Sequence, residues 1–303
     1  MVNRSFVLRG CGVVVAALLL APTAAWADEA ADHYNLGLTL KRQGKTEEAI
    51  AEVEKAIAIR PKYAAAHLTL GNLWRSKGDY AKAATEYEKT VDLESKDPLA
   101  HGNLGAAYLR LKRVDDAIKE LERAVELGPD VYDARVSLGA AYRQKGDFKS
   151  AIVHLQKATE LQPADGTAWN NLGVVKSRAD DKEGAIAAFK KALSINPNDA
   201  EGHFNLGVVY RRQRDTENAL GEYETAVKLN PRLAKAYYDL GILYSQERRT
   251  ADAAAAFRKY LETGTGEDAA SRKEAEERLK SLEAAGSGPG SRASGAVKPA
   301  RSK

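Results

Sequence analysis

The 303 residues carry 46 Lys and Arg against 42 Asp and Glu, which gives a formal net charge of +4. This small charge does not indicate a protein that binds the backbone of a nucleic acid. Hydrophobic residues make up 44% and charged residues 29% of the chain, which excludes both a membrane-filling protein and a wholly disordered one. Only 9 Pro interrupt a chain rich in Ala, Leu, Glu, Lys and Arg, and these residue types favour helix over strand. We therefore expect a folded, all-α protein.

Residues 1–27 have the order of a secretory signal peptide. Two arginines precede an apolar run over residues 10–21, and the small-residue site at 25–27 follows. The run is about a dozen residues, short of the roughly 18 that a membrane-spanning helix requires. We expect cleavage after Ala27 and a periplasmic or secreted protein. Cleavage also removes Cys11, the single cysteine, so no disulfide can stabilise the mature fold.

A repeat of 34 residues organises the chain over residues 28–266. The pair Leu-Gly recurs at this spacing, and an Ala stands twelve residues after each Gly. Small residues let two helices approach closely, and the large apolar residue four positions after the Ala lies on the same helical face. The residue pattern therefore predicts that each unit is a pair of amphipathic helices. The Leu-Gly pairs begin at Leu36, Leu70, Leu104, Leu138, Leu172, Leu206 and Leu240.

Glycine and proline mark the turns of this repeat. Gly44, Gly78 and Gly146 supply the turn between the two helices of a unit, and a proline closes five of the units, since proline cannot continue a helix. With its Leu-Gly, Tyr, Ala, aromatic, Ala and Pro pattern, the unit resembles the tetratricopeptide repeat. The resemblance implies an all-α, right-handed superhelical solenoid of seven helix-turn-helix repeats with peptide or protein ligands.

The segment after the repeats divides into two parts. Residues 267–284 carry acids and bases with sparse apolar positions, a pattern that suits a capping helix with one solvated face. Residues 285–303 are rich in Gly, Ser, Pro and basic residues and contain no aromatic residue. This composition cannot bury enough apolar surface to order itself, so we expect a flexible basic tail.

No catalytic or metal-binding set can be assembled from the spacing. The Gly-Lys-Thr at 44–46 resembles the end of a phosphate-binding loop, but Thr39 stands where that loop needs Gly. Four histidines occupy one position of their repeats, and equivalent positions on stacked helix pairs lie at least roughly 8–10 Å apart, too far to share a zinc ion. We expect no enzyme, metal or cofactor, and interpret these histidines as packing groups. They are His33, His67, His101 and His203, and Arg135, Trp169 and Tyr237 share their position.

Two functions follow from this architecture. The first is a non-catalytic protein–protein interaction scaffold of the bacterial cell envelope, which binds an extended polypeptide in a concave groove lined by the first helix of each pair. It would serve the assembly of a pilus, motility, secretion or outer-membrane machinery. The alternative is an accessory, substrate-presenting subunit of an envelope glycosyltransferase, polysaccharide-export or peptidoglycan enzyme. Co-purification of a turnover activity would separate the two.

The candidate groove contacts are two recurring polar positions of the first helices. An Asn immediately precedes the Leu-Gly pair in four repeats, and an Arg follows seven residues after each Asn. Seven residues are nearly two helical turns, so each Asn and its Arg share one stripe, roughly 10 Å apart. The peptide-binding candidates are Asn35, Asn103, Asn171 and Asn205 with Arg42, Arg110, Arg178 and Arg212.

This pattern has two interpretations. In the first, the Asn side chains hold the backbone of an extended peptide, as a similar asparagine ladder does in the O-linked N-acetylglucosamine transferase repeats, and the Arg row selects acidic side chains. It predicts an acidic, extended polypeptide as partner, with neither nucleic acid nor an integral membrane segment after signal cleavage. In the second, each Asn makes a local inter-helix hydrogen bond and each Arg only complements the negative end of its helix.

Overall fold

The computed structural model describes residues 21–264 and 269–286, and within these ranges it contains fifteen helices and no strand. The prediction of an all-α fold is therefore confirmed. The helices are α1 (Ala21–Arg42), α2 (Thr46–Ile59), α3 (Ala64–Ser76), α4 (Tyr80–Leu93), α5 (Pro98–Arg110), α6 (Val114–Leu127), α7 (Tyr132–Lys145), α8 (Phe148–Leu161), α9 (Gly166–Arg178), α10 (Lys182–Ile195), α11 (Ala200–Arg212), α12 (Thr216–Leu229), α13 (Ala234–Gln246), α14 (Thr250–Thr263) and α15 (Ala269–Gly286).

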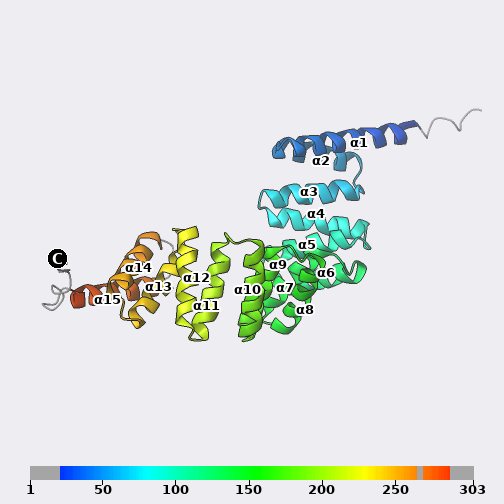
Figure 1. Ribbon diagram of the computed structural model, residues 1–303. Helices are drawn as coiled ribbons and strands as arrows, with labels where there is room; N and C mark the ends of the chain where they lie inside the picture. The colour runs from blue at the N-terminus through cyan, green and yellow to red at the C-terminus, as the bar shows by residue number, and fades with distance from the viewer. Residues whose placement is uncertain (1–20, 265–268, 287–303) are drawn as a thin grey trace, which may run out of the picture. The chain divides into compact units, whose positions relative to one another are not determined.

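The helices fall into seven consecutive pairs followed by α15. The described helices form two compact units, and the boundary between the units falls inside α7, after Ser137. From α1 to α6 in the first unit and from α8 to α15 in the second, each helix packs against the next one along the chain; Figure 1 shows α1 to α5 from blue to cyan and α9 to α15 from green to red. The expected repeat solenoid of helix pairs with a closing helix is thus confirmed.

Two expected segments lie largely outside the described residues. Most of the predicted signal peptide precedes residue 21, and most of the predicted basic tail follows residue 286. Helix α1 begins at Ala21, so the expected cleavage site after Ala27 lies within its range. None of the described helices is both long enough and apolar enough to cross a membrane.

The recurring Gly allows the two helices of each pair to touch. A Cβ on Gly105 would lie 2.5 Å from Cγ of Leu121, and a Cβ on Gly71 would lie 2.6 Å from the ring of Tyr87. Both large side chains are fully buried, and burial raises the pKa of Tyr87 to about 12. In every repeat the Gly faces the large residue sixteen positions later. The close approach of the helices therefore requires Gly at this position.

The turn inside each helix pair uses the left-handed backbone conformation. Gly44, Gly78 and Gly146 have φ values of 75°, 79° and 85°, as expected for glycine turns. The other four repeats make the same turn with a residue that carries a Cβ, which costs roughly 1–2 kcal/mol per residue. These residues are Lys112, Asp180, Arg214 and Arg248, with φ values of 61°, 61°, 62° and 58°.

Aspartate residues are the N-caps of many of the helices. In each of these caps the carboxylate accepts a hydrogen bond from a backbone N–H of the first turn, which otherwise has no partner in the helix. Asp79, Asp147, Asp181 and Asp215 cap the second helices α4, α8, α10 and α12. Asp97, Asp165 and Asp199 cap the first helices α5, α9 and α11.

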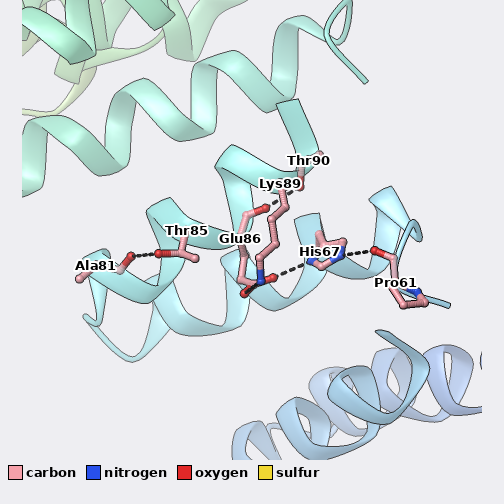
Figure 2. Close-up of polar contacts among 7 residues, drawn as sticks. All are labelled: Pro61, His67, Ala81, Thr85, Glu86, Lys89 and Thr90. Carbon is pink, nitrogen blue, oxygen red and sulfur yellow. Dashed lines mark hydrogen bonds and ion pairs between the residues drawn. The ribbon is translucent and has the colours of Figure 1, made fainter. Parts of the chain in front are cut away.

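A His–Glu pair connects the two helices in four repeats. The Nδ1 atom of His67 on α3 lies 2.6 Å from Oε2 of Glu86 on α4, and its Nε2 atom lies 2.9 Å from the carbonyl oxygen of Pro61 (Figure 2). Lys89 donates a further hydrogen bond of 2.8 Å to Oε1 of Glu86. The equivalent pairs are His33–Glu52, His101–Glu120 and His203–Glu222, at 2.6, 2.7 and 2.6 Å.

These contacts refine the interpretation of the histidines as packing groups. Each ring is held by polar contacts as well as by burial, and the partner Glu stands nineteen residues after the His in all four repeats. This spacing of His and Glu is present in the sequence, and it could have indicated the polar pair. Among the described residues, no group of three or more His, Cys, Asp and Glu side chains is placed to hold a metal ion.

Helix α15 closes the second unit, close to the predicted range of the capping helix. Its Ala275 is fully buried in a cluster with Phe257 and Tyr260 of α14. The hydroxyl of Tyr238 donates a hydrogen bond of 2.7 Å to Oε2 of Glu274. This bond and a contact with a nearby arginine lower the pKa of the Glu274 carboxyl. The last helix pair is thus covered by a helix that leaves its other face solvated.

Candidate peptide-binding surface

The candidate Asn residues all lie on first helices, directly before the Leu of each Leu-Gly pair. Asn35 is exposed, and the other three are half-buried. Asn205 on α11 donates a hydrogen bond of 3.5 Å from Nδ2 to Oδ1 of Asn170 on α9. The structure thus brings Asn205 to Asn170, the neighbour of the candidate Asn171, and this bond joins two successive repeats.

Two of the candidate arginines, Arg110 and Arg212, reach the preceding repeat. The guanidinium of Arg110 lies over the ring of Tyr80, 5.1 Å from its centroid, and donates a hydrogen bond of 3.1 Å to the Tyr80 hydroxyl. Arg212 donates a bond of 2.7 Å to the carbonyl oxygen of Ser177 near the end of α9, and it lies 3.3 Å from Asp180. Arg212 therefore complements the negative end of a helix, but that helix belongs to the neighbouring repeat.

The other two candidate arginines differ from this pair. Arg42 donates a hydrogen bond of 3.4 Å from Nε to the carbonyl oxygen of Leu38 in the last turn of its own helix. Arg178 is exposed, and its guanidinium has neither a hydrogen bond nor an ion pair within the described residues. Of the four, Arg178 is thus the arginine whose guanidinium is available to a ligand without breaking a contact.

A cavity of about 260 Å³ lies on the first helices of the first unit and contains one candidate, Asn103. Its lining combines apolar surface with polar groups that can orient a peptide. Leu99 is 59% exposed there, although it is a large apolar side chain. The lining residues are Arg75, Leu99, Gly102, Asn103, Ala106, Val131, Asp133, Ala134, Val136 and Ser137.

Arg75 in this cavity lacks the carboxylate that its equivalent has in the second unit. Four repeats later, NH1 of Arg211 lies 3.4 Å from Oδ1 of Asp239, which occupies the position of the candidate Asn in its repeat. The residue at that position beside Arg75 is Asn103, and Arg75 has no ion pair within the described residues. A free guanidinium beside an amide is suited to bind the carboxylate of a ligand.

The Arg211–Asp239 pair shows that a carboxylate fits between successive first helices. Asp239 is buried, and this burial raises the pKa of its carboxyl, while the charge of Arg211 acts in the opposite direction. Arg75 was not among the residues predicted from the sequence, because those were the arginines seven residues after each Asn. The useful signal is the arginine 28 residues before Asn103, a spacing that Arg211 and Asp239 repeat.

These helix pairs, with a Gly at each close approach, define a tetratricopeptide repeat protein. The family described as "Cilia and flagella-associated protein 70 C-terminal domain", a tetratricopeptide repeat family, matches residues 23–276. The chain belongs to this family. No curated protein matches the chain.

Solved structures of repeat proteins are similar to this chain. The crystal structure of YrrB, described as a tetratricopeptide repeat protein with an unusual peptide-binding site, is 25% identical with a TM-score of 0.53, over 61% of this chain and 95% of YrrB. PilF of Pseudomonas aeruginosa is 20% identical with a TM-score of 0.58, over 68% and 94% of the two chains. A tetratricopeptide repeat protein of Parabacteroides merdae is 17% identical with a TM-score of 0.63, over 84% and 99%.

The family and these structures assign the chain a general role. It is a protein–protein interaction scaffold. Tetratricopeptide repeat proteins are generally scaffolds without catalysis. The two structures below 25% identity contribute the fold alone to this assignment.

Proposed function

We propose that the protein is a non-catalytic scaffold of the bacterial cell envelope that binds an extended, acidic polypeptide along its first helices. The observation that carries this proposal is the cavity at Asn103, where Arg75 lacks a carboxylate partner. A carboxylate of the ligand would take the place that Asp239 occupies beside Arg211. Asn103 would bind the ligand backbone through its amide. The peptide-binding site described for YrrB supports a peptide as the ligand class.

The proposed location rests on the N-terminal sequence. The charged, apolar and small-residue segments of residues 1–27 favour export and cleavage before Asp28. In the periplasm the scaffold would serve the assembly of an envelope complex. N-terminal sequencing of the protein from an envelope fraction tests this location, and an intact Met1 in that fraction would contradict it.

The cavity at Asn103 is tested as the ligand site by crosslinking, followed by substitution. A photoreactive residue at position 99 should capture the partner in cells, while the same residue at Val153, an exposed apolar position of α8, should not capture it. With the partner identified, Arg75→Ala should weaken binding about fivefold to tenfold at low salt and less at high salt, because it removes a charge-assisted hydrogen bond. Asn103→Ala should weaken binding similarly at every salt concentration.

The matched control is Arg123→Ala on the second helix α6, where the arginine pairs with Glu126 at 3.0 Å. This variant removes the same charge from the same unit, and it should bind the partner like the wild type. If Arg75→Ala and Asn103→Ala both fold and bind as tightly as the control, the cavity at Asn103 is not the ligand site.

A further inference from the structure

A second cavity, of about 620 Å³, lies in the fifth repeat between α8, α9 and α10. It shares no residue with the cavity at Asn103, and two of its three helices are second helices. Its lining residues are Gln156, Thr159, Glu160, Trp169, Leu172, Lys176, Gly184, Ala187, Ala188 and Lys191.

The cavity stands where four repeats have the His–Glu pair. Trp169 occupies the position of the His and Ala188 that of the Glu. Trp169 Nε1 donates a hydrogen bond of 3.0 Å to the carbonyl oxygen of Pro163, as the ring of His67 does to Pro61. Because indole has a single N–H, Trp169 has no donor left for a Glu. Ala188, which lines the cavity, lacks the carboxylate that stands at this position in four repeats.

The same replacement leaves Lys191 without a partner. In the first two repeats the equivalent Lys55 and Lys89 donate to the Glu three residues before them, at 2.7 and 2.8 Å. Ala188 removes that acceptor from Lys191, and Ser194 stands three residues after it. In other repeats a Glu stands three residues after the equivalent cation, in the place of Ser194, and the cation pairs with that Glu. These pairs are Arg123–Glu126, Lys157–Glu160 and Lys259–Glu262. Within the described residues, the Lys191 ammonium has neither a hydrogen bond nor an ion pair.

Two further replacements make this cavity more positive than its equivalents. Gln156 stands where other repeats have a Glu that accepts a hydrogen bond from a Tyr, and Lys176 stands where that Tyr is. Lys176 itself pairs with Asp181 at 2.9 Å, and the lining carboxylate Glu160 lies 3.4 Å from Lys157. Lys191 is therefore the cation of the lining that is free for a ligand.

We propose that this cavity binds a partner polypeptide through an Asp or Glu side chain whose carboxylate pairs with Lys191. The carboxylate takes the place of the Glu that Ala188 replaces. An apolar side chain next to it in the partner packs against Trp169 and Leu172. This site shares no residue with the cavity at Asn103. A test of one proposal can therefore fail without contradicting the other.

The seventh repeat provides a matched control within the same unit. Tyr237 and Ala256 replace the His and the Glu there, and the equivalent cavity is about 260 Å³. Its cation, Lys259, already donates a hydrogen bond of 2.8 Å to Glu262. The apolar lining is thus repeated, but the free cation is not.

The test uses two blocked peptides, N-acetyl-Leu-Glu-Leu-amide and its Gln analogue, titrated into the full chain. Binding is measured from the NMR shift of the Trp169 indole N–H. The Glu peptide should bind roughly threefold to fivefold more tightly than the Gln peptide, the range expected for one solvent-accessible ion pair. Lys191→Ala should abolish this preference, whereas Lys259→Ala should preserve it.

A second variant, Ala188→Glu, keeps the test conclusive. It gives the fifth repeat the Glu of four other repeats, so it should fold, occupy the cavity and pair with Lys191. Binding of the Glu peptide should then be lost while the unfolding midpoint is maintained. The proposal is overturned if the two peptides bind equally, if Lys191→Ala keeps the preference, or if Ala188→Glu still binds. A Trp169 shift that depends on protein concentration without peptide would overturn it too, since a second copy of the chain would then fill the cavity.

Discussion

Asp239 is a buried carboxyl whose ionisation the fold disfavours. Burial raises the pKa of its carboxyl although Arg211 lies 3.4 Å away. The folded chain therefore binds this proton more tightly than the unfolded chain. The contribution of the protonated Asp239 carboxyl to the free energy of unfolding is fully present below the ordinary pKa of Asp. It is lost as the pH rises through the raised pKa of the folded state.

We predict that Asp239→Asn stabilises the protein at neutral pH. The amide is neutral at every pH, and Asn occupies this position in four other repeats. Arg211 stays solvated because its side chain is 39% exposed, so the loss of its partner costs little. Thermal unfolding followed by circular dichroism between pH 3 and 8 measures the effect. The variant's advantage should shrink as the pH falls and the wild-type carboxyl becomes protonated, and a difference that is constant across this range would refute the explanation.

At the scale of the helix pair, the Gly of each Leu-Gly pair sets the distance between the two helices. Gly105→Ala would place a methyl group 2.5 Å from a buried Leu121 atom, so we expect a loss of about 1–3 kcal/mol in the free energy of unfolding. Gly221 lies inside α12 with no neighbouring atom within 4 Å of an added Cβ. Gly221→Ala should therefore raise the free energy of unfolding by about 0.5–1 kcal/mol.

Urea unfolding of both variants measures these opposite signs. The pair separates a packing effect from helix propensity, since Ala is the better helix former at both sites. Equal stabilisation by the two substitutions would show that the helices of the pair do not need Gly at position 105.

At the scale of the whole molecule, contacts join helices that are close neighbours along the chain. Each helix pair buries its apolar face against the adjacent pairs, so stability is a sum of local terms and about three repeats suffice. We predict that a fragment of residues 28–161, which holds the first four repeats, folds without the rest. Far-ultraviolet circular dichroism should show a helical spectrum and a cooperative melt. A random-coil spectrum would mean that the repeat boundaries assigned here are wrong.

The amino-acid sequence by itself determined the helices, the repeat and the family. These properties are local, because an amphipathic period and a small residue at a fixed place decide which helical face is buried. The glycine turns were predicted in three repeats, while residues such as Lys112 make the same turn against their conformational preference, which no local pattern indicates.

Only the tertiary structure decided which polar groups remain available to a ligand. Arg110 and Arg178 look alike in the sequence, but Arg110 contacts Tyr80 of the preceding repeat and Arg178 has no partner within the described residues. The free cations Arg75 and Lys191 became visible only when each was compared with its paired equivalents. The physical reason is that a helical period specifies the face on which a side chain stands. Whether its charge is satisfied depends on what the neighbouring helices place within about 4 Å of it.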